Sequence, residues 1–148
     1  MANLIEHKRV RFDYELLSIF EAGMELLGAE VKSLRAHHGK LEGAHITVRG
    51  KEAFLVGMEI PPYQSQPISE GYESQRNRRL LLNKAELEEL SEAEETKGLT
   101  IVPIAVYNKG RVIKISIAIA KGKKKGDKRE TIKKREAERE IAHSMKIR

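Results

Sequence analysis

Residues 111–120, RVIKISIAIA, decide the fold class that this sequence predicts. Isoleucine stands at every second position from Ile113 to Ile119, and Lys114 is the first of the small or polar residues between them. A period of two places alternate side chains on opposite faces of a β-strand. We therefore expect a strand that buries its isoleucines in a core and turns Lys114 to the other face.

Four more segments have β character, at residues 15–27, 45–48, 53–56 and 99–107. The links Asn108-Lys109-Gly110 and Arg49-Gly50-Lys51 are short and contain glycine, which suits tight antiparallel hairpins. Gly23 is expected to interrupt the first of the four segments. Five short strands predict a mainly β protein with flanking helices, built as a small antiparallel barrel resembling the oligonucleotide-binding (OB) fold.

Two helices and one long loop accompany these strands. Asn83 can cap a helix that ends at Gly98, with Glu86 three residues later as its capping-box partner. A second helix is expected over residues 29–36, and residues 61–75, rich in Pro, Ser, Gln and Gly, form a loop. The polar residues of the second helix are expected to point outward: Glu30, Lys32 and Arg35.

The basic charge of the chain is concentrated at its C-terminal end. Residues 121–148 hold twelve Lys or Arg against five Asp or Glu, a net charge of +7, whereas residues 1–120 sum to −1. We expect a barrel domain over 1–120 and a basic, flexible tail over 121–148 that becomes helical when bound, with Ala137, Ile141 and Met145 on one side. Such a tail favours a polyanion, most plausibly RNA. It lacks Phe, Trp, Tyr and Leu, which disfavours membrane docking.

The sequence offers little for an enzyme. Cysteine is absent, and the five histidines are scattered without the spacing of a metal site. Gly122-Lys123-Lys124 lacks the first glycine and the Ser or Thr of a nucleotide-binding loop. We expect no catalytic residue, no metal and no cofactor, and no signal peptide or membrane span directs the protein out of the cytoplasm.

Two groups of charged residues are candidates for RNA contacts. Arg76, Arg78 and Arg79 precede three leucines, so guanidinium groups would stand beside an apolar anchor, although a solvated basic loop explains them equally well. Glu21 and Glu30 could accept hydrogen bonds from base edges. Ordinary solubility is the simpler explanation of these two carboxylates.

Five ordered blocks carry a resemblance that the single motifs do not. The blocks are Phe20-Glu21-Ala22-Gly23, Gly28-Ala29-Glu30-Val31-Lys32-Ser33-Leu34-Arg35, Arg76-Asn77-Arg78-Arg79-Leu80-Leu81-Leu82, Lys97-Gly98-Leu99-Thr100 with Val102-Pro103, and Gly122-Lys123-Lys124 with Asp127-Lys128-Arg129. In this order and spacing the chain resembles the SsrA-binding protein (SmpB) family from about His7 to Arg139. The resemblance implies an adaptor that binds the tRNA-like domain of transfer-messenger RNA and brings it to stalled 70S ribosomes for trans-translation. We expect the protein to be a monomer in the cytoplasm.

The resemblance also implies roles for particular residues. It assigns RNA binding to Glu21, Leu81, Asn83 and Lys114, and it places the tail against 16S rRNA in the decoding centre and mRNA channel. With the candidates above, the expected RNA-binding set is Glu21, Glu30, Lys32, Arg35, Arg76, Arg78, Arg79, Leu81, Asn83 and Lys114. The expected ribosome-binding residues of the tail are Lys123, Lys124, Asp127, Lys128, Arg129, Lys133, Lys134 and Met145. The alternative is a constitutive small ribosomal protein whose basic tail binds rRNA.

Overall fold

A computed structural model describes residues 3–63 and 72–123 of the chain. Seven strands and three helices follow one another in the order β1 (Asn3–Glu6), α1 (Val10–Asp13), β2 (Tyr14–Met24), α2 (Gly28–Arg35), β3 (His45–Arg49), β4 (Glu52–Val56), β5 (Arg78–Leu81), α3 (Lys84–Glu95), β6 (Leu99–Lys109) and β7 (Val112–Gly122).

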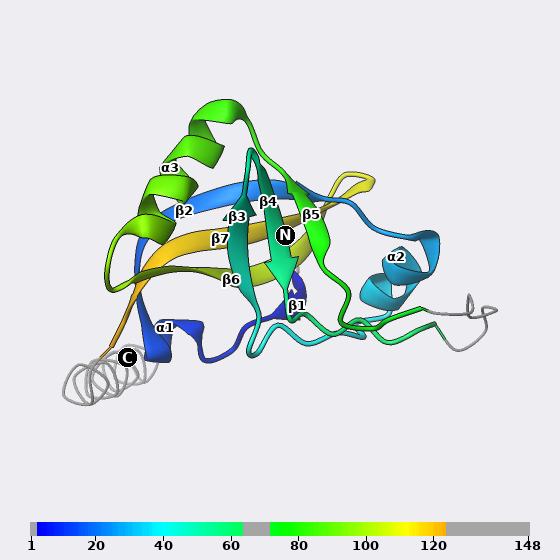
Figure 1. The fold of residues 1–148 in the computed structure, drawn as a ribbon. Helices are drawn as coiled ribbons and strands as arrows, with labels where there is room; N and C mark the ends of the chain where they lie inside the picture. Colours follow the sequence, from blue (N-terminus) through cyan, green and yellow to red (C-terminus); the bar gives the residue numbers. More distant parts are fainter. Residues whose placement is uncertain (1–2, 64–71, 124–148) are drawn as a thin grey trace, which may run out of the picture.

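The strands form one antiparallel sheet in the order β1-β6-β7-β2-β5-β4-β3 (Figure 1). The long strands β2, β6 and β7 pair along most of their length, and the short strands β3, β4 and β5 continue the sheet. β3, at one end of this order, packs against β6 near the other end, so the sheet curls into a nearly closed barrel. The predicted fold class is therefore confirmed.

The core lies inside the barrel and contains the alternating isoleucines of β7. Ile113, Ile115, Ile117 and Ile119 are all buried, whereas Lys114 is partly exposed on the opposite face. The alternation predicted this orientation because successive side chains of a strand point to opposite faces. Near its C-terminal end β7 is buried on both faces, because α1 covers Ala120 from outside in a second small cluster with Val10 and Val102.

Both predicted helices are present. The Glu86 N–H donates to Asn83 Oδ1 at 2.8 Å and the Asn83 N–H donates to Glu86 Oε1 at 3.1 Å, so the expected capping box begins α3. α3 packs on β3 and β6 through Leu90 and Ala93, which closes that part of the barrel. No helix in the described part of the chain is long and apolar enough to cross a membrane.

Three short elements were not expected from the sequence. β1 and α1 have four residues each. β5 lies within residues 76–82, the arginine-rich segment that ends in three leucines. The expected break at Gly23 was wrong, because β2 continues through it and pairs there with both Lys114 of β7 and Leu81 of β5. A Cβ at Gly23 would lie 3.3 Å from the Leu81 Cβ, so glycine permits the close approach that joins β5 to the sheet.

The described chain ends just beyond the expected domain boundary at residue 120. β7 continues to Gly122, and the Lys123 N–H and ammonium donate to the carbonyl oxygens of Asp13 and Arg11, both at 2.9 Å. The barrel therefore includes residues 121–123. The expected loop over 61–75 contains no helix or strand in its described residues, 61–63 and 72–75.

Candidate RNA-binding surface

The outer face of the three long strands brings four polar side chains together. Gly23 of β2 and Tyr107 of β6 both pair with Lys114 of β7, and Glu21 pairs with Ser116. Because the isoleucines of β7 point inward, Lys114 and Ser116 point outward. Their cross-strand partners Tyr107 and Glu21 point outward with them. Glu21 and Lys114, far apart in the sequence, thus lie on one surface together with Tyr107 and Lys109.

The carboxylate of Glu21 is held by two hydrogen bonds from β6. The Tyr107 hydroxyl donates to Glu21 Oε2 at 2.5 Å, and the Lys109 ammonium donates to Oε1 at 2.9 Å. The hydrogen bond from Tyr107, followed by that from Lys109, lowers the pKa of Glu21, so the carboxylate stays ionised. Burial and the neighbouring Glu21 raise the pKa of Tyr107 to about 12, so the hydroxyl keeps its proton and remains a donor.

Leu81 and Asn83 extend this surface along the end of β5. The Leu81 side chain is 49% exposed and lies over Gly23. It offers an apolar contact beside the polar cluster that contains Glu21 and Lys114. Asn83 is exposed at the start of α3, where its side chain caps the helix. The structure thus places Glu21, Lys114 and Leu81 on the adjoining strands β2, β7 and β5, and Asn83 two residues beyond β5 at the start of α3.

Replacing Asn83 separates its capping role from any contact with RNA. We expect Asn83→Ala to lower the free energy of unfolding by about 1 kcal/mol, because the Glu86 N–H loses its acceptor. Asn83→Ser retains a capping oxygen and should keep the stability while RNA affinity still falls. Urea unfolding and RNA titration of both variants measure the two effects. RNA affinity that is normal in the Ser variant would show that Asn83 acts only as a cap.

The predicted contact of Glu30 and Arg78 with RNA is wrong, because both side chains are fully buried. Arg78 donates to Glu30 Oε2 through Nε at 2.9 Å and Nη2 at 2.6 Å, and its Nη1 donates to the Met58 carbonyl oxygen at 2.7 Å. Glu30 was expected on the outer face of its helix. It points inward instead, where it forms an ion pair with the buried guanidinium of Arg78. A periodicity argument could not detect a buried partner 48 residues away.

Arg76 binds the buried Glu30 and remains partly exposed at the surface. Its Nε donates to Glu30 Oε2 at 3.0 Å and its Nη2 donates to Oε1, while 30% of its side chain stays exposed. The Tyr72 hydroxyl donates to the Ile60 carbonyl oxygen at 2.7 Å. Arg76 therefore ties the segment after residue 71 to Glu30 of α2, and Tyr72 ties it to Ile60, the residue before the loop.

The remaining predicted cations are exposed but lie at different places. Arg35 at the end of α2 donates to the Arg111 carbonyl oxygen at 3.0 Å, which brings it to the turn between β6 and β7, close in sequence to Lys109. Arg79 on β5 pairs with Glu25 at 3.3 Å and Glu52 at 3.5 Å. Lys32 is exposed on α2. Of the predicted tail residues only Lys123 is described; Lys124, Asp127, Lys128, Arg129, Lys133, Lys134 and Met145 lie outside the described residues.

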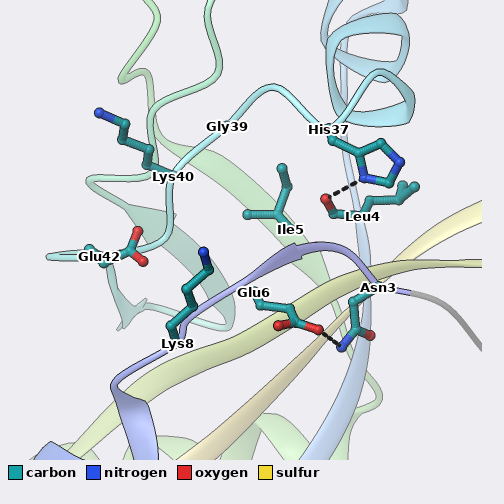
Figure 2. Close-up of a pocket in the computed structure, with 9 residues that line it drawn as sticks. All are labelled: Asn3, Leu4, Ile5, Glu6, Lys8, His37, Gly39, Lys40 and Glu42. Carbon is teal, nitrogen blue, oxygen red and sulfur yellow. Dashed lines mark hydrogen bonds between the residues drawn. The ribbon is translucent and has the colours of Figure 1, made fainter.

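An open pocket of about 670 Å³ lies between β1 and the segment that follows α2 (Figure 2). Lys8, Lys40 and Glu42 are among the residues that line it. His37 lies two residues beyond the end of α2 with φ +63°, and its Nδ1–H donates to the Leu4 carbonyl oxygen at 2.9 Å. Within 3–63 and 72–123, no three His, Asp or Glu side chains gather as metal ligands.

A nearly closed antiparallel barrel with a polar outer strand face and a basic C-terminal continuation defines a small β-barrel protein of the nucleic-acid-binding class. Residues 4–147 match the SmpB protein family. The chain belongs to this family.

Individual relatives agree with the family match. An SsrA-binding protein of Microcystis aeruginosa is 42% identical over 143 residues, which cover 97% of this chain and 93% of the relative. One from Oleidesulfovibrio alaskensis is 43% identical, with 97% and 92% covered. A chain of the solved structure described as "tmRNA-SmpB: a journey to the center of the bacterial ribosome" is 40% identical, with a TM-score of 0.69 over 81% of this chain and 84% of that one.

Proposed function

We propose that this protein is an RNA-binding adaptor for ribosome rescue. It binds the tRNA-like domain of transfer-messenger RNA, the SsrA RNA, and delivers that RNA to stalled 70S ribosomes for trans-translation. The observation that carries the proposal is the family match over residues 4–147, joined by relatives named SsrA-binding proteins that cover nearly the whole chain. The proposal needs no catalytic residue and no cofactor, and it places the protein in the cytoplasm, where ribosomes translate.

The geometry of the outer strand face supports different roles for the barrel and the tail. Glu21, Leu81 and Lys114 offer an acceptor, an apolar contact and a cation on adjoining strands, and Asn83 offers an amide at the start of α3. These groups suit specific recognition by the barrel, whereas the tail from residue 124 onward, with its excess of Lys and Arg, suits contact with 16S rRNA in the decoding centre. The exposed cations Lys32, Arg35 and Arg79 and the partly exposed Arg76 add phosphate contacts around the face.

The test is binding of the full-length protein to three RNAs at two salt concentrations: the tRNA-like domain, an ordinary tRNA and an unrelated hairpin. We expect a preference for the tRNA-like domain that persists at the higher salt, since hydrogen bonds and shape are screened less than phosphate contacts. Lys114→Ala should weaken that binding and reduce the slope of log K against log salt by about one unit.

The outcomes of this experiment separate the proposal from its alternative. Equal and steeply salt-dependent binding to all three RNAs would contradict specific recognition and favour a ribosomal protein with a basic extension. Sedimentation gives an independent answer: a rescue factor should be substoichiometric on ribosomes and enriched on those stalled without a stop codon, whereas a structural protein should accompany every ribosome in equal number.

A further inference from the structure

Glu21 is a carboxylate on the surface that, under the proposed function, faces a polyanion. The charge repels phosphate, and nearby phosphates favour its protonation, so a bare glutamate at this place would work against RNA binding. The structure surrounds the side chain with groups that change this balance. Tyr107 and Lys109 reach it from β6 across the intervening strand β7, and Lys114 lies beside it on β7.

The two hydrogen bonds fix the direction in which the carboxylate can accept. Each oxygen of Glu21 receives one hydrogen bond, from the Tyr107 hydroxyl at 2.5 Å and from the Lys109 ammonium at 2.9 Å. A carboxylate offers about four lone-pair positions, so others remain for a ligand. The Glu21 side chain is 37% exposed, and these positions are therefore accessible from solvent.

We propose that Tyr107 and Lys109 are positioning residues, which hold Glu21 as an oriented, ionised acceptor for an N–H or O–H donor of the bound RNA. Such donors are the ribose 2′-hydroxyl and the amino and ring N–H groups of the bases, whereas an ionised phosphate diester has no donor. The carboxylate then discriminates between RNA groups, while the ammonium of Lys109 offsets its repulsion of the backbone. This inference rests on the proposed function, because it deepens the role of the same surface.

The decisive experiment is a double-mutant cycle between Tyr107 and Glu21, measured as affinity for the tRNA-like domain. Tyr107→Phe removes only the hydroxyl and keeps the ring, and we expect affinity to fall about fivefold, as for the loss of one hydrogen bond. In the Glu21→Ala background the same change should have no further effect, because no carboxylate is left to orient. Tyr63→Phe, outside this surface, is the matched control and should bind as the wild type does.

A second measurement distinguishes positioning from a general structural effect. The Glu21 carboxyl can be titrated by carbon NMR in the free protein, and its pKa should be higher in Tyr107→Phe than in the wild type, because the tyrosine is the largest cause of its lowering. Lys109→Met should change the titration in the same direction. Lys51→Met, on the turn between β3 and β4, should leave it unchanged.

The results separate this inference from the proposed function. Wild-type protein that shows no preference for the tRNA-like domain contradicts the proposed function itself. If the wild type shows the preference, then an unchanged affinity of Tyr107→Phe, or an equal loss in the Glu21→Ala background, overturns the positioning role alone. RNAs with single 2′-deoxy substitutions identify the donor. A position where the substitution weakens binding of the wild type but not of Glu21→Ala assigns a ribose hydroxyl, and the lack of any such position assigns an N–H group of a base.

Discussion

Replacing Glu30 by alanine is expected to lower the free energy of unfolding by about 3–5 kcal/mol, the usual cost of leaving a buried charge without its partner. Arg78 is fully buried and directs three nitrogen atoms at Glu30 and backbone carbonyls, so without the carboxylate its charge stays in the core with only dipoles around it. Arg76 loses both of its hydrogen bonds to Glu30 as well. Urea unfolding monitored by circular dichroism measures the loss.

Two further variants make this prediction specific. Glu30→Gln keeps the shape and one acceptor oxygen but not the charge, and it should fall between the wild type and Glu30→Ala. Glu89→Gln, an exposed glutamate of α3, is the matched control and should be close to neutral. If Glu30→Ala lost as little free energy of unfolding as the control does, the prediction would be contradicted. Such a result would show that water solvates Arg78 and that the Glu30–Arg78 ion pair contributes little to stability.

The pH dependence of stability follows from the same group. Burial by itself would raise the pKa of Glu30, but hydrogen bonds from Arg76, the Leu27 N–H and Arg78 outweigh it and hold the pKa below the ordinary value of 4.5. A carboxyl with a lowered pKa in the folded state stabilises the fold above its unfolded pKa, and this contribution is lost as the pH falls through the folded value. The wild type should therefore lose more stability on acidification below 4.5 than Glu30→Gln does.

Removal of the tail after Lys123 is expected to abolish peptide tagging while affinity for the tRNA-like domain stays largely intact. The proposed RNA-binding residues of the barrel all precede the cut, whereas the removed segment carries most of the basic excess of the chain. Tagging in a reconstituted translation system on ribosomes without a stop codon, compared with RNA binding of the same protein, measures the two activities. Loss of both together would contradict the division between barrel and tail.

The position of the cut matters because the sheet does not end at residue 120. Lys121 and Gly122 pair with Glu15 and Tyr14, and Lys123 donates hydrogen bonds to backbone carbonyl oxygens of α1. A protein truncated after Ala120 would lose these contacts and could fail through the barrel as well as through the tail. Comparing the two truncations shows which part of any defect belongs to the fold: only the shorter protein should unfold at lower urea.

Local patterns in the sequence were sufficient for the longer strands and for both of the longer helices. The isoleucine alternation of residues 111–120 identified β7 and its buried face, and Asn83 with Glu86 identified the start of α3. Both are short-range signals, in which the residues that define the element are also those that stabilise it. β1 and β5 could not be found in this way, since four-residue strands gain their stability from pairing with distant strands and carry little pattern of their own.

The sequence by itself determined the barrel class, the main strands and helices, and the separation of a near-neutral body from a basic tail, because periodicity, capping and charge are properties of neighbouring residues. Only the tertiary structure decided which charged groups serve the surface and which serve the core. Glu21 and Glu30 are the same residue type, yet one lies on the outer face with Tyr107 and the other is buried against Arg78. The difference arises from partners more than 40 residues away: strand pairing brings Tyr107 to Glu21, whereas the fold places Glu30 of α2 against Arg78 of β5.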